Sequence, residues 1–180
     1  MKQPLSSAPD VHAPADPGGF AFDSPELGDE FLPRHYASQF GCHGENASPA
    51  LTWRNAPDDT KSFAITVFDP DAPGDGFWHW LVYNIPPAVH ALPTGAGDPS
   101  NRFLPEGAVQ VLTDANTLGY FGPCPPRGQR HRYVFTLYAC TKMLTLRGGE
   151  QPFAVEREVK KHAIAQASFT VYGKRITVNG

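Results

Sequence analysis

The sequence predicts a mainly β fold, with long loops and one α-helix near the end of the chain. Proline and glycine contribute 19 and 17 of the 180 residues, and both residue types interrupt long helices. Several apolar segments of strand length, rich in β-branched and aromatic side chains, are separated by proline- and glycine-rich stretches. Aromatic residues make up 12% of the chain, which indicates a folded protein and not a disordered one. At this length, one domain with a substantial core is the simplest organisation.

The N-terminal sequence differs in composition from the rest. Residues 1–19 contain four prolines among small and acidic residues, which is typical of a tail. A short extended segment begins at Phe20. We therefore expect a flexible tail over residues 1–19 and a single domain over residues 20–180.

Four segments carry the clearest strand predictions. In Ser62–Asp69, successive side chains would point to opposite faces of a strand, and β-branched and aromatic residues dominate the segment. Trp78–Ile85 is rich in aromatic residues, so it is expected to be buried on both faces, and two prolines end it. The other two segments are His131–Cys140 and Phe169–Val178, with Gly173 as a turn or bulge inside the last one.

One helix is expected, over Pro152–Ala167. Proline is favoured at the first position of a helix. Apolar residues recur at four-residue intervals from Val155 to Ala167, which places one apolar stripe along the helix. Glutamates precede lysines in this segment, and the helix dipole favours that order.

Charge and hydropathy exclude several classes of protein. Fifteen basic residues against eighteen acidic ones provide no basic surface for general nucleic-acid binding. No run of apolar residues is long enough to cross a bilayer, so stable membrane insertion is not expected. The N-terminal residues lack the apolar segment of a signal peptide. On this basis the protein is expected to be cytoplasmic.

The cysteines leave one question open. The chain contains three of them, Cys42, Cys124 and Cys140. An odd number excludes a framework in which every cysteine is bridged. One bridge with one free thiol remains an alternative to three free thiols.

Two proline-rich loops precede two of the predicted strands. Asp69–Pro73 leads toward the strand with His79, and Gly122–Gly128 leads toward the strand with His131. Proline fixes φ and removes a backbone donor, so such loops are stiff. Stiff loops at strand ends can hold a few polar groups among apolar walls, which is the composition of a small-molecule pocket. The candidate polar groups are Asp69, Asp71, His79 and His131, among Trp78, Trp80, Tyr133 and the loop prolines.

These residues also have ordinary structural interpretations. An aspartate before a proline is common turn chemistry, which would account for Asp69 and Asp71. A histidine between two tryptophans, as His79 is, often belongs to a core. Arg132 is expected to pair with a carboxylate beneath the site and not to contact a ligand. Spacing alone does not decide between these interpretations and a pocket.

Several stretches resemble the signatures of the phosphatidylethanolamine-binding protein family. They are DPDAP at residues 69–73, WHWLVYNIP at 78–86 and GPCPPRGQRHRYVFTLYA at 122–139. GENASPALTW at 44–53 and DTKSFA at 59–64 resemble its prokaryotic Raf-kinase-inhibitor-like branch. The similarity runs from about residue 20 to about residue 175, which is nearly all of the expected domain.

The resemblance implies a β-sandwich with a small pocket near one end that holds phosphate head groups or other small anions. It also leads us to expect a cis bond in the first loop, at Ala72–Pro73. By motif match, the implied ligand-binding residues are Asp69, Asp71, Trp78, His79, Cys124, Pro125, Pro126, His131 and Tyr133.

The chemistry of these residues suits a phosphate ligand. Backbone N–H groups and imidazoles can donate hydrogen bonds to it. The carboxylates would fix the tautomer of the histidines and favour their charged form. The resemblance thus implies a regulatory module without enzymatic activity or cofactor, which binds a small anionic or phosphorylated ligand and modulates a protein kinase or protease. The prokaryotic relatives also suggest a homodimer.

Two other functions remain open. A hydrolase would use His131 or His79 as its general base. Asp69 or Asp71 would orient that histidine, and Cys124 would be the nucleophile. A metal site would use the same histidines and aspartates, although none of the seven histidines has the spacing of a metal-binding motif.

Overall fold

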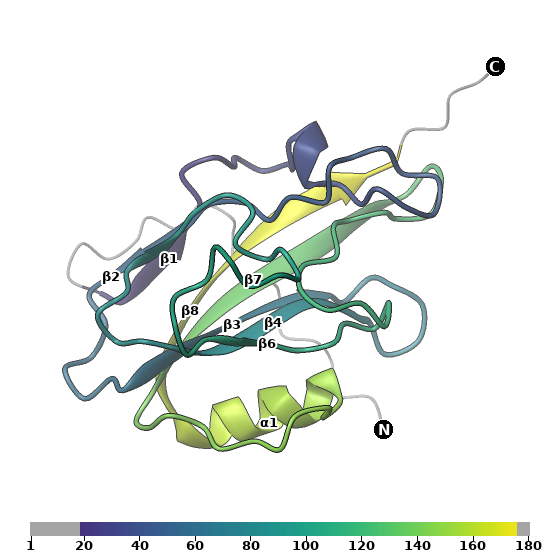
Figure 1. Cartoon of the computed structure of the whole chain (residues 1–180). Helices are drawn as coiled ribbons and strands as arrows, with labels where there is room; N and C mark the ends of the chain where they lie inside the picture. Colours follow the sequence, from purple (N-terminus) through teal and green to yellow (C-terminus); the bar gives the residue numbers. More distant parts are fainter. Residues whose placement is uncertain (1–18, 176–180) are drawn as a thin grey trace, which may run out of the picture.

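The structure is a computed structural model that describes residues 19–175. The tail expected over residues 1–19 therefore lies almost entirely outside the described residues, as does the end of the strand expected over Phe169–Val178. In the described part, two β-sheets pack against each other, and one helix lies against the larger sheet (Figure 1). A mainly β sandwich with one late helix is thereby confirmed.

The larger sheet has five strands in the order β6-β4-β3-β7-β8, and the smaller has three in the order β1-β2-β5. All of these pairings are antiparallel. The smaller sheet consists of β1 (Ala21–Asp23), β2 (Leu51–Arg54) and β5 (Ala91–Leu92). The larger consists of β3 (Ser62–Asp69), β4 (Phe77–Ile85), β6 (Val109–Gln110), β7 (Arg130–Cys140) and β8 (Ala163–Lys174). A short 3-10 helix, η1 (Pro33–His35), and the helix α1 (Pro152–His162) complete the elements.

The main core lies between the two sheets and is largely aromatic. Phe63, Trp80 and Phe135 of the larger sheet are fully buried there. Trp53 of β2 packs against Phe63 with ring centroids 5.5 Å apart, so the smaller sheet covers the face of the core that lies opposite the larger sheet. Phe135 stacks on Phe169 of β8 at 4.9 Å.

The helix α1 covers the opposite face of the larger sheet. Its buried residues Val155 and Val159 pack in one cluster with Leu81 and Tyr83 of β4. The central strands are therefore covered on both faces. This explains why their sequences are apolar at most positions and not only at alternate ones.

The helix is shorter than predicted. It ends at His162, and Ala163 already has the extended ψ of 130°. Apolar side chains at Ala163 and Ala167 fit a four-residue interval, but with Ala165 between them they also fit the two-residue repeat of a strand. Pairing of this segment with β7 decides the outcome, because β7 would otherwise leave a long edge unpaired.

Gly173, expected as a turn or bulge, lies instead in the regular pairing of β8, opposite His131. A Cβ at this position would come within 2.7 Å of the Tyr133 ring and 3.0 Å of Pro123. Glycine therefore lets β8 approach a ring and a loop that border the cavity described next.

Candidate functional site

The two proline-rich loops meet at one end of the larger sheet, where they border a cavity of about 500 Å³. At this end β3 finishes with Asp69, β4 begins with Phe77, and β7 begins with Arg130. Antiparallel pairing thus brings together loops that are far apart in the sequence.

The cavity collects most of the predicted site residues. Seven of the nine line it, namely Asp69, His79, Cys124, Pro125, Pro126, His131 and Tyr133. The other two, Asp71 and Trp78, do not line it. Much of the remaining wall is apolar and was not predicted, and it includes Phe40, Phe77, Ala115 and Phe121.

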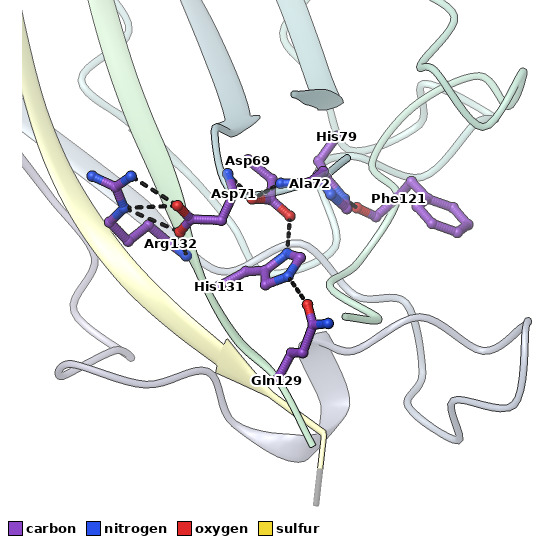
Figure 2. A network of polar contacts seen from close by, with 8 residues as sticks. All are labelled: Asp69, Asp71, Ala72, His79, Phe121, Gln129, His131 and Arg132. Atoms are coloured by element: carbon purple, nitrogen blue, oxygen red, sulfur yellow. Dashed lines mark hydrogen bonds and ion pairs between the residues drawn. The ribbon is translucent and has the colours of Figure 1, made fainter. Parts of the chain in front are cut away.

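His131 is held between two side chains (Figure 2). Its Nδ1 lies 2.7 Å from Oδ2 of Asp69, and its Nε2 lies 2.8 Å from Oε1 of Gln129. His131 and Asp69 are both buried, with 4% and 2% of their surface exposed. A buried imidazole that is bonded at both nitrogens has a fixed orientation, and its carboxylate partner favours a proton on Nδ1.

Asp69 also organises the first loop. Its Oδ1 accepts the backbone N–H groups of Asp71 at 2.8 Å and Ala72 at 3.1 Å. Burial raises the pKa of Asp69 above its ordinary value, although the hydrogen bonds from His131 and Asp71 oppose the rise. A turn closed by the Asp69 side chain in this way bends the first loop without a cis peptide bond. Residues 19–175 contain no cis peptide bond, so the expected cis conformation at Ala72–Pro73 is wrong.

His79 is bonded to a backbone carbonyl and not to a carboxylate. Its Nδ1 donates to the carbonyl oxygen of Phe121 at 2.7 Å, and its ring meets that of Tyr133 edge to face at 5.0 Å. Burial lowers the pKa of His79 from its ordinary value of 6.5 to about 4. His79 is therefore uncharged at neutral pH. The expected carboxylate partner exists for His131 and not for His79.

A register shift in β4 decides which side chains face the cavity. Val67 of β3 pairs with Trp80, but the next residue, Phe68, pairs with Trp78, so His79 is the extra residue of a bulge. His79 therefore shares the inner face with Trp80. Trp78 turns to the outer face and packs on Phe68 with centroids 4.5 Å apart. Phe77 occupies the place in the cavity wall that the sequence assigned to Trp78.

Asp71 pairs with Arg132, as the sequence predicted for this arginine. Its carboxylate accepts from Nη2 of Arg132 at 2.8 Å and from the Arg132 backbone N–H at 2.8 Å. The side-chain hydrogen bond to Arg132 lowers the pKa of Asp71. Asp71 thus fastens the first loop to β7 beside the cavity (Figure 2).

A double-mutant cycle on Asp71 and Arg132 should measure this attachment. Both side chains are 30% exposed, so we expect a coupling free energy of about 1 kcal/mol at neutral pH. Because the pKa of Asp71 is lowered on folding, the contribution is present above the ordinary value of 3.8 and is lost at lower pH. Urea unfolding of the wild type, Asp71→Asn, Arg132→Gln and the double variant provides the measurement. A coupling near zero at neutral pH would contradict the expectation.

Cys42 and Cys124 form a disulfide with their Cα atoms 6.0 Å apart, and Cys140 is a free, buried thiol. One bridge with one free thiol was the alternative that the sequence left open. The bridge ties the segment that contains Phe40 to the second loop. Phe40 lies in the cavity wall against Phe121, with centroids 5.9 Å apart. While the bridge is intact, Cys124 has no thiolate with which to act as a nucleophile.

Gln129, which lies beside the cavity, and Phe40, which lies in its wall, are two of the residues that sequence reasoning missed, and they were missed for different reasons. Gln129 lies two positions before His131, and residues two apart share one face of an extended chain. That spacing was a usable signal for their contact. Phe40 has no such signal, because only the disulfide and the folding of its loop bring it to the cavity.

Two features that would point to other functions are absent from the part of the chain that the structure describes. Within residues 19–175, no three histidine, cysteine, aspartate or glutamate side chains gather in a way that could hold a metal ion. In the same range, no helix is both long and apolar enough to cross a membrane.

Comparison with known proteins points to one family. A family model described as phosphatidylethanolamine-binding protein matches residues 26–174. YbcL of Escherichia coli (strain K12) is 47% identical over 129 residues, which are 69% of this chain and 70% of YbcL. YbhB of the same organism is 41% identical over 145 residues, or 79% of this chain and 91% of YbhB. LppC of Mycobacterium tuberculosis, named as a lipoprotein, is 37% identical over 130 residues, or 72% of this chain and 61% of LppC.

A solved structure supports the same relationship. The crystal structure of E. coli YbcL, described as a new member of the mammalian PEBP family, superposes with a TM-score of 0.83 at 40% identity. It covers 86% of this chain and 98% of the YbcL chain. With its sequence and its fold in agreement, the chain belongs to the phosphatidylethanolamine-binding protein family, in the prokaryotic branch of YbcL and YbhB.

Proposed function

We propose that the protein binds a small phosphorylated or otherwise anionic ligand in this cavity and acts as a regulatory binding module. The observation that carries the proposal is the bonded pair of Asp69 and His131 at one end of a cavity with largely apolar walls. A few oriented polar groups on an apolar wall are what a small-molecule site requires. Membership of the family supports the same class of ligand.

The cavity would hold an anion by hydrogen bonds more than by net charge. Of the described residues that line it, none is lysine or arginine. Burial raises the pKa of Tyr133 far above its ordinary value, so its hydroxyl keeps its proton and can donate. His131 and the backbone N–H groups of the loops are the other donors. Asp114 is the exposed charged side chain among the described lining residues. With so few exposed charges, ligand affinity should depend only weakly on ionic strength.

Binding is favoured over hydrolysis by the state of the candidate nucleophile. Cys124 is in a disulfide, and the described lining residues include no serine or threonine. The hydrolase alternative keeps one supporting observation, the bond between Asp69 and His131, which resembles a general base and its orienting carboxylate. Turnover of phosphoesters that stops in His131→Ala would support that alternative.

Asp69→Asn should weaken phosphate binding at least tenfold. The substitution removes the carboxylate that orients His131 and fixes the turn at Asp71 and Ala72, and a hydrogen bond to a charged group contributes roughly 1.5–3 kcal/mol. Titration calorimetry with inorganic phosphate and phosphoethanolamine provides the measurement. The matched control is Asp58→Asn, at an exposed turn, which should bind like the wild type. Equal affinity of the two variants, or no binding by the wild type, would contradict the proposal.

The regulatory partner and the assembly state are part of the same proposal. From the resemblance to the Raf-kinase-inhibitor-like branch, we propose a protein kinase or protease as the partner and a homodimer as the assembly. Light scattering of the purified protein tests the dimer. Inhibition assays against candidate kinases and proteases, with Asp69→Asn as the comparison, test the regulatory role.

The bridge between Cys42 and Cys124 bears on where the protein works. Disulfides persist in oxidising compartments and are rare in the cytoplasm, and one relative, LppC, is named as a lipoprotein. We therefore propose an oxidising compartment in place of the cytoplasmic location expected from the sequence. Thiol labelling of freshly lysed, denatured cells should detect one thiol per chain there, and three in a reducing compartment.

A further inference from the structure

Gln129 occupies the end of the His131 ring that Asp69 leaves open. Oε1 of Gln129 lies 2.8 Å from Nε2 of His131, while Oδ2 of Asp69 lies 2.7 Å from Nδ1. Figure 2 shows the two side chains at opposite ends of the ring. Both ring nitrogens are therefore engaged within the protein. Because both partners are oxygen acceptors, this arrangement corresponds to the form of the ring in which each nitrogen carries a proton, and neither proton is then free for a ligand.

The side chain of Gln129 is placed so that it can move while its backbone stays fixed. Its backbone N–H donates to the carbonyl of Pro126 at 3.0 Å, and its carbonyl accepts from the N–H of Arg175 at 3.1 Å. The side chain itself is exposed. Within residues 19–175, the Nε2 of His131 is the one hydrogen-bond partner of its amide. Turning this exposed amide away therefore breaks a single side-chain hydrogen bond.

The amide also stands outside the present cavity. His131 lines the cavity, whereas Gln129 does not. Gln129 therefore closes the Nε2 end of the ring from beyond the cavity wall. If it turned into solvent, it would expose to a ligand the ring nitrogen that Asp69 does not hold.

We propose that Gln129 is an internal competitor of the ligand, whose carboxamide oxygen takes the place of a ligand oxygen at His131 until binding displaces it. This inference rests on the proposed function. A charged oxygen is a stronger acceptor than a neutral carboxamide, so an anionic ligand gains from the exchange and a neutral one does not. The apparent affinity then equals the intrinsic affinity multiplied by the fraction of molecules in which Gln129 is turned away.

Phosphate affinity in variants of Gln129 tests the proposal. Gln129→Ala removes the competitor, and Gln129→Asn is too short to reach Nε2, so both should bind inorganic phosphate about fivefold more tightly, the effect of losing one competing hydrogen bond. Gln129→Glu should bind at least tenfold more weakly, because a carboxylate competes more strongly and repels the anion. Gln166→Ala, which alters an exposed glutamine of β8, is the matched control and should bind like the wild type.

A spectroscopic measurement separates competition from a structural effect. The proton on Nε2 of His131 should give a protected resonance in the wild type, should exchange rapidly in Gln129→Ala, and should be protected again when phosphate is added. Equal affinity of the wild type and Gln129→Ala, or an unchanged resonance, overturns the role of Gln129 and leaves the proposed function standing. Absence of phosphate binding in every variant overturns the proposed function, and the role of Gln129 with it.

Discussion

Replacing Cys42 and Cys124 together by serine should lower the free energy of unfolding by about 4 kcal/mol. The two cysteines are 82 residues apart in the sequence. A cross-link that closes so long a loop removes much conformational freedom from the unfolded chain, and this freedom returns when the bridge is lost. Urea unfolding of the oxidised wild type and the double variant at pH 7 measures the difference.

The third cysteine provides the control for this experiment. Cys140 is buried and unbridged, so Cys140→Ala leaves the disulfide intact. Reductant should destabilise Cys140→Ala as much as it destabilises the wild type, and it should leave the double serine variant unchanged. If the double variant were as stable as the oxidised wild type, the bridge would contribute nothing to stability and the expectation would be wrong.

Acid should destabilise the wild type through His79. Its pKa is lowered to about 4 in the folded protein, against 6.5 when unfolded. Between these two values the unfolded chain binds a proton that the folded chain does not, so stability falls as pH decreases from 6.5 to 4. The shift corresponds to a loss of about 3 kcal/mol over that window. In His79→Gln this part of the acid sensitivity should be absent.

Urea unfolding at a series of pH values between 7 and 4 measures the effect. His90→Gln is the control, because His90 is exposed and its replacement should leave the pH profile of the wild type unchanged. Parallel profiles for the wild type and His79→Gln would show that His79 takes up its proton equally in the folded and unfolded states, which contradicts the expectation.

The central strands were predictable because their burial is complete. β3, β4 and β7 are covered by the smaller sheet on one face and by the helix on the other, so their apolar character is continuous and visible in the sequence. In the smaller sheet, the extended segment expected from Phe20 contains β1, whereas β2 and β5 were not predicted. β2 and β5 are four and two residues long, and a periodicity needs more residues than that to be detected.

The candidate site was predictable where loop chemistry alone positions a residue. Proline-rich loops at strand ends pointed to Asp69 and His131, and the structure brings these two into direct contact. The exchange of Trp78 for Phe77 was not predictable, because it depends on how β4 pairs with its neighbour. The place of Phe40 depends on a disulfide, whose partners the sequence left undecided.

The bulge in β4 decides whether the odd-numbered or the even-numbered residues before it face the cavity. In a strand, odd and even positions face opposite sides, and the unpaired His79 reverses the count for every residue before it. If the same β4 sequence paired with β3 without the bulge, Trp78 would face the cavity and the imidazole of His79 would face away from it. One residue inserted in β3, opposite the bulge, would have this effect with β4 untouched. The number of residues in β3, which contains no histidine, therefore determines which way His79 of β4 points.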